Sequence, residues 1–285
     1  MDNRVKNYAG LRSWLIYDED GAKRNADYIE MHRELAERFH LSLHLVMDHD
    51  VSGLLKQSDK LPDFCFVRTI QPKMNKQLED KGIVVYNSSF VSEICNDKGK
   101  TIQYVKKCTH VPVISTCCYK RNQLSQKLLE QYPDHVIKAV DGHGGKQVFL
   151  TSESFSDIEQ AMEKSDFIIQ PRIRGKGQDI RVYVIGTKIM GAVIRTAKNG
   201  FKSNFSLGGE VQPYTLKEKD KKMIQEILSA FSFGMAGIDF LVDNDENLIF
   251  NEIEDVVGAR MFYQCYPNIN LLEEYFRFVL ELHCK

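Results

Sequence analysis

The sequence lacks both a long apolar run and an appreciable net charge, and each absence excludes a class of protein. No stretch of the 285 residues approaches the roughly 20 apolar residues that a membrane-spanning helix needs. The first seven residues lack the apolar segment of a signal peptide. The net charge is −1 at pH 7, which argues against nucleic acid or an acidic membrane as the main partner. We therefore expect a cytoplasmic protein that binds neither.

The cysteines form no framework of disulfides and no zinc site. There are seven, an odd number without regular spacing, and Cys117 and Cys118 are adjacent. No set of cysteines and histidines has the spacing of zinc ligands. This pattern is typical of reduced thiols.

Residues 237–254 predict a β-hairpin around which the rest of the sequence is organised. Two apolar runs rich in β-branched residues flank the turn-forming residues 244–247. A loop of these four residues would place Asp243 opposite Leu248. Counting back from that pair fixes which side chains face each other across the hairpin.

This register gathers three carboxylates on one face. Asp239 falls across from Glu252, and Glu254 lies on the same face opposite Gly237, which would leave space there. Like charges so close repel each other, so we expect a positive group between them. Three oxygen ligands of this kind suit Mg²⁺. A solvent-facing hairpin with acids scattered among lysines would give the same pattern.

The first third of the sequence predicts a small parallel sheet, because strands alternate with helices. We expect strands at 11–17, 43–47, 64–68 and 82–86, helices at 25–39 and 74–80, and a polar loop at 18–23. Charged residues fall at strand ends, where such sheets bind ligands. They are Asp18, Asp20, Lys23, Arg24 and Arg68. Each is a candidate for contacting a substrate, although solvated side chains would look the same.

Residues 135–150 predict two strands around a loop with three glycines in four positions. Glycines let backbone N–H groups converge on a phosphate, and Lys138, on the strand that enters the loop, would supply a positive charge. The loop is not a P-loop, because no Gly-Lys-Ser/Thr follows it and a strand comes next. An ordinary glycine-rich turn with an exposed lysine is the alternative.

The remaining elements are expected as helices at 101–108, 123–131, 156–164, 216–233 and 271–282, and strands at 111–114, 167–173, 179–185 and 188–196. The loop at 197–209 is cationic and contains Lys202 and Asn204. It would suit a polyphosphate opposite a metal held by carboxylates. The last helix is apolar enough for the core or for an interface, so a homo-oligomer is left open.

An ordered set of motifs resembles that of the ATP-grasp carboxylate-amine ligases of the RimK-like branch. The motifs are Ile169-Gln-Pro-Arg-Ile173, Gln178-Asp-Ile-Arg181, Ala192-Val-Ile-Arg195, Phe201-Lys-Ser-Asn204, Gly208-Gly209, Gly237-Ile-Asp239 and Asn251-Glu-Ile-Glu254. The resemblance runs from about Asp97 to the C-terminus. It implies an α/β fold of the α+β ATP-grasp type. Residues 1–95 would form a pre-ATP-grasp domain with a small parallel sheet, and residues 96–173 (the lid) and 174–285 (the metal site) would clamp a nucleotide.

By position, the resemblance also implies roles for individual residues. Those that would contact ATP are Lys98, Lys138, Gly144, Gly145, Gln170, Pro171, Ile173, Asp179 and Lys202. Arg195 would face the transferred phosphate as the catalytic residue, and Asp239, Glu252 and Glu254 would bind the metal. Candidates for contacting the substrate are Arg68, Asn204 and Arg260.

Three positions depart from the family pattern. Glu254 stands where Asn is usual and adds a negative charge. Pro171 replaces an acidic residue of the linker, although backbone contacts to adenine could remain. The small residues and Pro-Gly that usually follow the metal strand are replaced in residues 255–260, a segment expected to border the acceptor, so the acceptor is not indicated.

The reaction implied is the ATP-dependent joining of a carboxylate to an amine through an acyl phosphate. The substrates would be small molecules or peptides, with an amino acid or a peptide as the family-based expectation. ATP and Mg²⁺ are implied, with two ions and with Mn²⁺ as a substitute. Two alternatives are a phosphotransferase of the same fold and a catalytically silent, nucleotide-binding regulatory module.

Overall fold

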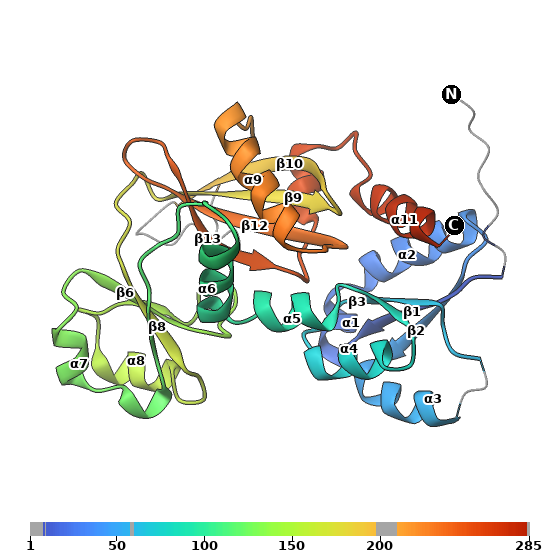
Figure 1. Cartoon of the computed structure of the whole chain (residues 1–285), viewed down its shortest axis with the longest axis horizontal. Helices are drawn as coiled ribbons and strands as arrows, with labels where there is room; N and C mark the ends of the chain where they lie inside the picture. The colour runs from blue at the N-terminus through green and yellow to red at the C-terminus, as the bar shows by residue number, and fades with distance from the viewer. Residues whose placement is uncertain (1–7, 9, 58–59, 198–209, 284–285) are drawn as a thin grey trace.

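The computed structural model describes residues 8, 10–57, 60–197 and 210–283 and arranges them around three β-sheets (Figure 1). The loop residues Lys202 and Asn204 lie outside the described residues. Among the helices in the described ranges, none is both long and apolar enough to cross a membrane. The domain boundaries at residues 95 and 173 stay a prediction.

The first sheet is parallel, as predicted, with the strand order β2-β1-β3-β4. Its strands are β1 (Arg12–Tyr17), β2 (Ser42–Met47), β3 (Phe64–Val67) and β4 (Val84–Tyr86). The helices of this part are α1 (Glu19–Arg24), α2 (Ala26–Arg38), α3 (Val51–Gln57), α4 (Pro72–Glu79) and α5 (Ser89–Cys95), with a 3₁₀ turn at Asp48–Asp50. After β1 the chain builds β2 on one side, and it later builds β3 and β4 on the other. The carboxyl ends of β1 and β3 therefore flank the point where the strand order reverses.

The polar loop predicted at residues 18–23 is wrong, because these residues begin helix α1. The side chain of Asp18 caps the helix by accepting from the backbone N–H of Gly21 at 2.7 Å. Acids in the first turn and bases in the last complement the helix dipole. Helix α3 was not predicted either.

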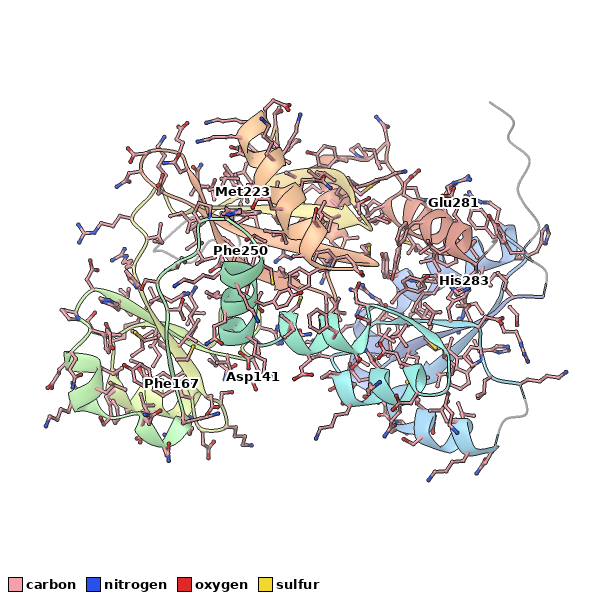
Figure 2. The ribbon with its side chains drawn as sticks, in the orientation of Figure 1. Asp141, Phe167, Met223, Phe250, Glu281 and His283 are labelled. Atoms are coloured by element: carbon pink, nitrogen blue, oxygen red, sulfur yellow. The ribbon has the colours of Figure 1, made fainter. Side chains whose placement is uncertain are left out.

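The second sheet has the order β5-β8-β6-β7. Its strands are β5 (Cys117–Tyr119), β6 (His135–Ala139), β7 (Val148–Leu150) and β8 (Phe167–Pro171), and the helices of this part are α6 (Lys98–Cys108), α7 (Gln126–Glu130) and α8 (Phe155–Ala161), with a 3₁₀ turn at Arg121–Gln123. The prediction of two strands around the glycine loop is confirmed by β6 and β7, which pair antiparallel. Buried side chains, among them Phe167, form a separate small core here (Figure 2).

The third sheet is antiparallel, with the order β11-β10-β9-β12-β13. Its strands are β9 (Gln178–Ile185), β10 (Lys188–Thr196), β11 (Glu210–Tyr214), β12 (Met235–Val242) and β13 (Leu248–Glu254), and α9 (Glu218–Ala230), α10 (Arg260–Cys265) and α11 (Leu271–Leu282) complete this part. Side chains of α6 and α9 pack on one face of the sheet in a core that includes Phe250 and Met223 (Figure 2). Helix α9 falls within the helix predicted at residues 216–233, and it buries Ile224, Ile227 and Leu228. Neither β11 nor α10 was predicted.

The last helix, α11, belongs to the core between the first and third sheets. It lies beside α2 (Figure 1), and its apolar face is buried in a cluster that includes Phe66 of β3 and Tyr183 of β9. The apolar stripe thus serves intramolecular packing, and the oligomeric state stays a prediction.

The strand predicted at residues 111–114 is wrong. The segment forms a single isolated bridge, between Val113 and Phe250, and the N–H of Phe250 donates to the carbonyl of Pro112 at 2.9 Å. Pro112 has no N–H of its own to donate. The segment therefore lies alongside β13 without extending the sheet.

Candidate active site

The carboxylate hairpin consists of β12 and β13. Its predicted register is confirmed at the three carboxylates but not near the turn. Asp239 pairs with Glu252 and Gly237 with Glu254, as predicted. Near the turn the prediction is wrong, because Val242 rather than Asp243 pairs with Leu248. The register then shifts by one residue between Asp239 and Phe240, which is a β-bulge.

The bulge places Asn251 as the extra residue, so that it lines the same pocket as Glu252. Gly237 does not leave space on this face, contrary to the prediction. A Cβ atom there would lie 2.7 Å from Cγ2 of Val257, so Val257 fills the position.

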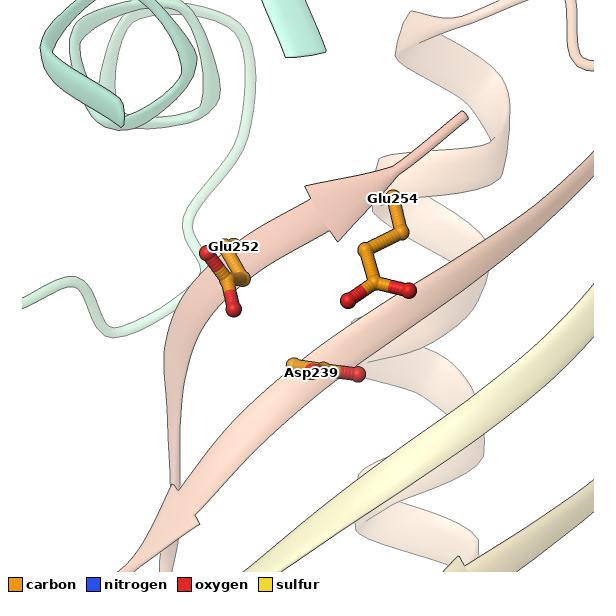
Figure 3. A group of neighbouring side chains, drawn as sticks. All are labelled: Asp239, Glu252 and Glu254. Carbon is orange, nitrogen blue, oxygen red and sulfur yellow. The ribbon is translucent and has the colours of Figure 1, made fainter. Parts of the chain in front are cut away.

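The three carboxylates of this face converge (Figure 3). One ligand oxygen from each of Asp239, Glu252 and Glu254 lies within 4.8 Å of the others. The side chain of Asp239 is 1% exposed, whereas those of Glu252 and Glu254 are 27% and 32% exposed. An ion from solvent would therefore reach the two glutamates first. The spacing and the all-oxygen donor set fit Mg²⁺.

The positive group expected among the carboxylates is Arg181. It lies on β9 directly across from Asp239 and donates from Nε and Nη2 to both oxygens of that carboxylate, at 2.8 and 2.7 Å. The same Nη2 donates to Glu254 at 2.6 Å. The sequence prediction gave no role to Arg181, because its partner lies on a strand far along the chain.

A second buried arginine extends this network toward the pocket. Arg195 on β10 donates from Nε to Asp179 at 2.7 Å and from Nη2 to Asp239 at 2.7 Å. Burial alone would raise the pKa of Asp239, but Arg181 and Arg195 together outweigh it and lower the pKa to about 2. Asp239 is thus ionised and held between two guanidinium groups.

A cavity of about 450 Å³ opens between the second and third sheets. Its lining includes most of the residues predicted to contact ATP: Lys98, Lys138, Gly144, Gly145, Gln170, Pro171, Ile173 and Asp179. The predicted catalytic residue Arg195 and the predicted metal ligand Glu252 also line it. The volume lies within the usual range for small-molecule sites. The structure therefore brings the predicted nucleotide residues together around one space.

Two lysines line this cavity, and their partners are neighbouring residues of β13. Lys98, in the first turn of α6, lies 3.3 Å from Glu252 and also donates to the carbonyl of Gly142. Lys138 on β6 donates to Oδ1 of Asn251 at 2.9 Å. Burial lowers the pKa of Lys138 to about 8, although Glu252 opposes this effect. Both ammonium groups are placed to meet an anion.

Gln170 also lines the cavity, and the orientation of its amide follows from its neighbours. The hydroxyl of Thr116 donates to the carbonyl of Ile114 at 2.8 Å, so it must accept the 2.9 Å bond from Nε2 of Gln170. This leaves Oε1 of Gln170 as a buried acceptor without a partner in the described ranges. Such an acceptor fits the exocyclic amine of a base.

The glycine loop supplies the wall above the lysines. Gly144 and Gly145 have φ angles of +65° and +72°, which side-chain-bearing residues seldom adopt. Their N–H groups could approach a phosphate without obstruction. These contacts stay a prediction.

Some predicted site residues lie elsewhere. Arg68 donates to the carbonyl of Val257 at 2.8 Å and does not line the cavity. Arg260 is exposed at the start of α10. Asp179, predicted near a ribose, lines the cavity but is ion-paired with Arg195.

Comparison with known proteins places this site in a family. The model of the RimK-like ATP-grasp domain matches residues 95–278. Among solved structures, a RimK domain ATP-grasp protein from Sphaerobacter thermophilus superposes with a TM-score of 0.70 at 16% identity, over 95% of this chain and all of that one. At that identity the likeness concerns the fold.

Relatives of similar sequence include proteins with and without an assigned activity. Uncharacterized protein MG011 of Mycoplasma genitalium is 30% identical over 73% of this chain and 70% of its own length. Human N-acetylaspartylglutamate synthase A is 28% identical over 71% of this chain, and the tetrahydromethanopterin:alpha-L-glutamate ligase of Methanosarcina acetivorans is 29% identical over 58%. The match spans 56% of the length of each of these two enzymes.

These names, together with the fold, support an ATP-dependent ligase as the enzyme class, and the family uses ATP and Mg²⁺. The chain belongs to the RimK-like ATP-grasp family.

Proposed function

We propose that the protein joins a carboxylate to an amine at the expense of ATP, through an acyl phosphate. The observation that carries this proposal is that one cavity is lined by the amide of Gln170, by Lys98 and Lys138, and by Glu252 of the carboxylate face. A nucleotide laid along it would meet a base acceptor at one end. Its phosphates would meet two lysines and the metal ligands at the other.

Asp239, Glu252 and Glu254 would hold magnesium, and we propose two ions, for which Mn²⁺ can substitute. Bound there, the metal would neutralise phosphate oxygens and orient them. The third acid gives the site one more negative charge than an asparagine would, and Arg181 already offsets it by its bond to Glu254. The departure at this position is therefore compatible with metal binding.

The chain's own residues would carry the remaining work. Lys98 and Lys138 would hold the phosphates, and Arg195, which lines the cavity beside Glu252, would stabilise charge on the group in transfer. The carboxylate oxygen of the substrate attacks the γ-phosphorus, and the bond to ADP breaks. The amine then attacks the acyl carbon and loses a proton as phosphate leaves. The glycine loop would exclude water from the intermediate.

The substrate class follows the named relatives, two of which are a glutamate-containing dipeptide synthase and a glutamate ligase by name. We propose an amino acid or a peptide as one substrate. The segment after β13 is anchored by Arg68 and Tyr183 through the carbonyls of Val257 and Gly258. We propose that it borders the acceptor.

The test is phosphate release from Mg-ATP with pools of carboxylic acids and amines, using wild type and Glu252→Gln. Release that requires one acid and one amine, and that disappears in the folded variant, supports the proposal. Near-normal activity in Glu252→Gln would refute the metal assignment. A stable phosphorylated product without an amide would indicate the phosphotransferase, and tight Mg-ATP binding without turnover would indicate the regulatory module.

A further inference from the structure

A cluster of buried polar groups lies outside the cavity described above, at the edge of the first sheet. Tyr17 is the last residue of β1, Arg68 directly follows β3, and Tyr28 lies on α2. The carboxyl ends of β1 and β3 flank the reversal of strand order, which is where open parallel sheets bind ligands. The position of the cluster therefore suits a binding site.

Three atoms of the cluster are buried without a hydrogen-bond partner among the residues that the structure describes. They are the hydroxyls of Tyr17 and Tyr28 and Nε of Arg68. Tyr17 and Arg68 are close enough to interact with each other, with the guanidinium donating to the hydroxyl oxygen, but the Tyr17 hydroxyl would still have its own hydrogen to donate. Buried polar atoms are nearly always paired in folded proteins. The guanidinium can only donate, and each hydroxyl can donate. The two hydroxyl hydrogens thus lie together without an acceptor among the described residues, which indicates a missing acceptor.

The side chains are held in place by contacts that leave the two hydroxyl hydrogens without an acceptor among the described residues. Arg68 donates from Nη2 to the carbonyl of Val257 at 2.8 Å, and its Cζ lies 5.4 Å from the ring centroid of Tyr28. The ring of His32 packs edge-on against Tyr28 at 4.8 Å, and its Nδ1 is bonded to the Tyr28 carbonyl. Tyr28 and Arg68 are partly exposed as residues, but their unpaired atoms are covered, so a ligand would have to displace neighbouring side chains to reach them.

The cluster adjoins the carboxylate face through Tyr183. This residue lies two positions beyond Arg181 on β9, and its hydroxyl donates to the carbonyl of Gly258 at 3.1 Å. It interacts electrostatically with Tyr28 on one side and with Arg181 and Glu254 on the other. Tyr183 is itself buried, so the cluster and the carboxylate face are neighbours across this one side chain.

The charge of the cluster matches a carboxylate better than a phosphoryl group. Arg68 is its one cation among the described residues that surround it, and the acid Asp255 lies within electrostatic range of Arg68. Burial raises the pKa of the Tyr28 hydroxyl, which Arg68 only partly offsets, so the hydroxyl stays a donor. A single negative charge is what this set can neutralise.

We propose that Arg68, Tyr17 and Tyr28 bind a carboxylate of the substrate other than the one that is activated. The substrate pair would then include either a dicarboxylic acid or an amino acid whose α-carboxylate remains free. This inference rests on the proposed ligase function, which supplies the reacting carboxylate and amine. The inference adds a second carboxylate, beside the reacting carboxylate and amine, as the group by which the enzyme selects its substrate.

The first experiment measures phosphate release from Mg-ATP with matched substrates. Succinate and glutarate are compared with butyrate and valerate, and alanine and glutamate with their α-amides. We expect wild type to require the second carboxylate in one of these arms, which identifies the substrate that carries it. In Arg68→Met, kcat/KM for that substrate should fall about 10- to 100-fold, with KM for ATP unchanged. The same substitution at the exposed Arg33 should change neither.

Tyrosine variants separate ligand binding from folding. Tyr28→Phe removes a hydroxyl that has no partner within the described part of the chain, so it should not lower the melting temperature. Both Tyr28→Phe and Tyr17→Phe should raise KM for the selected substrate. Tyr263→Phe is the matched control. Its hydroxyl accepts from the N–H of Leu272 at 3.1 Å, so its loss should lower stability and leave selectivity intact.

Unchanged selectivity in Arg68→Met and in both tyrosine variants would overturn the proposal, as would a wild type indifferent to the second carboxylate. If no pool supports phosphate release, the proposed function fails. The carboxylate subsite is then tested separately, by ligand-induced shifts of the melting temperature. Glutarate should then raise the melting temperature of wild type more than valerate does, and Arg68→Met should abolish the difference. Equal shifts with both acids would overturn the inference.

Discussion

We expect Arg181 to contribute strongly to the stability of the metal-free protein, and the variant Arg181→Met tests this expectation. Its guanidinium forms three hydrogen bonds, two to Asp239 and one to Glu254. Removing one partner of a buried ion pair costs about 3–5 kcal/mol, because a charge stays buried without compensation. Two features reduce the cost here. Arg195 still donates to Asp239, and Glu254 is 32% exposed and can be hydrated.

We therefore expect a loss of about 3 kcal/mol in the free energy of unfolding without metal. For a chain of this size the melting temperature should fall by roughly 6–12 °C. The assay is urea denaturation at several Mg²⁺ concentrations. Magnesium should stabilise Arg181→Met more than wild type, because the ion no longer competes with an internal cation for Asp239 and Glu254.

The control is Arg33→Met, which removes an exposed pair with Glu30 and should change the free energy of unfolding by less than about 0.5 kcal/mol. Two results would refute the reasoning. One is an Arg181→Met protein as stable as wild type without metal. The other is an equal response of both proteins to magnesium, which would mean that Arg181 does not neutralise the metal ligands.

Three further predictions concern single contacts. Lys138→Met should weaken ADP binding by roughly tenfold or more. Asn251→Ala removes the acceptor of Lys138, so it should weaken ADP binding in wild type but not in the Lys138→Met background. Additive effects of the two substitutions in a calorimetric titration would show that Asn251 does not act through Lys138. Burial lowers the pKa of His32 from 6.5 to about 3, so the unfolded chain binds the extra proton between these values. The contribution of the neutral His32 to the free energy of unfolding is complete above pH 6.5 and is lost as the pH falls toward 3, by about 1.4 kcal/mol per pH unit. In His32→Leu the free energy of unfolding, measured by denaturation at each pH, should no longer show this slope, and an unchanged slope would contradict the assignment. Gly237→Ala should cost about 1–3 kcal/mol through its contact with Val257, and Val257→Ala should relieve that clash in the double variant; a neutral Gly237→Ala in thermal melts would show that Val257 can yield.

Sequence periodicity predicted the elements whose burial is local. Helices α2, α9 and α11 were predicted, and each buries an apolar face. An amphipathic helix needs its apolar face covered, whichever element covers it. The capping pattern of α1 was also present in the sequence, with Asp18 ahead of two acids and a final Lys-Arg. A test for capping residues would have found that helix.

The hairpin shows how a correct site was predicted with an incorrect turn. The pairing of Asp239 with Glu252 is confirmed, but the turn is longer by one residue than expected and the bulge at Asn251 restores the register. Turn length and bulges depend on how the strand ends pack, so alternation of apolar residues does not reveal them. The role of Asn251 as the partner of Lys138 follows from that bulge.

The sequence by itself determined the residue types of the site and their order. It carried the three carboxylates on one face of a hairpin, the glycine loop with its lysine, and the motifs that resemble the RimK-like ATP-grasp family. These are properties of short stretches, and short stretches define a strand face or a loop.

Only the tertiary structure decided which charges neutralise one another. The pairing of β9 with β12 brings Arg181 to Asp239, and the packing of the first sheet on the third brings Arg68 to the carbonyl of Val257, 189 residues away. Contacts between residues so distant along the chain depend on the order of strands and the docking of sheets. The spacing of residues within a motif contains no information about either.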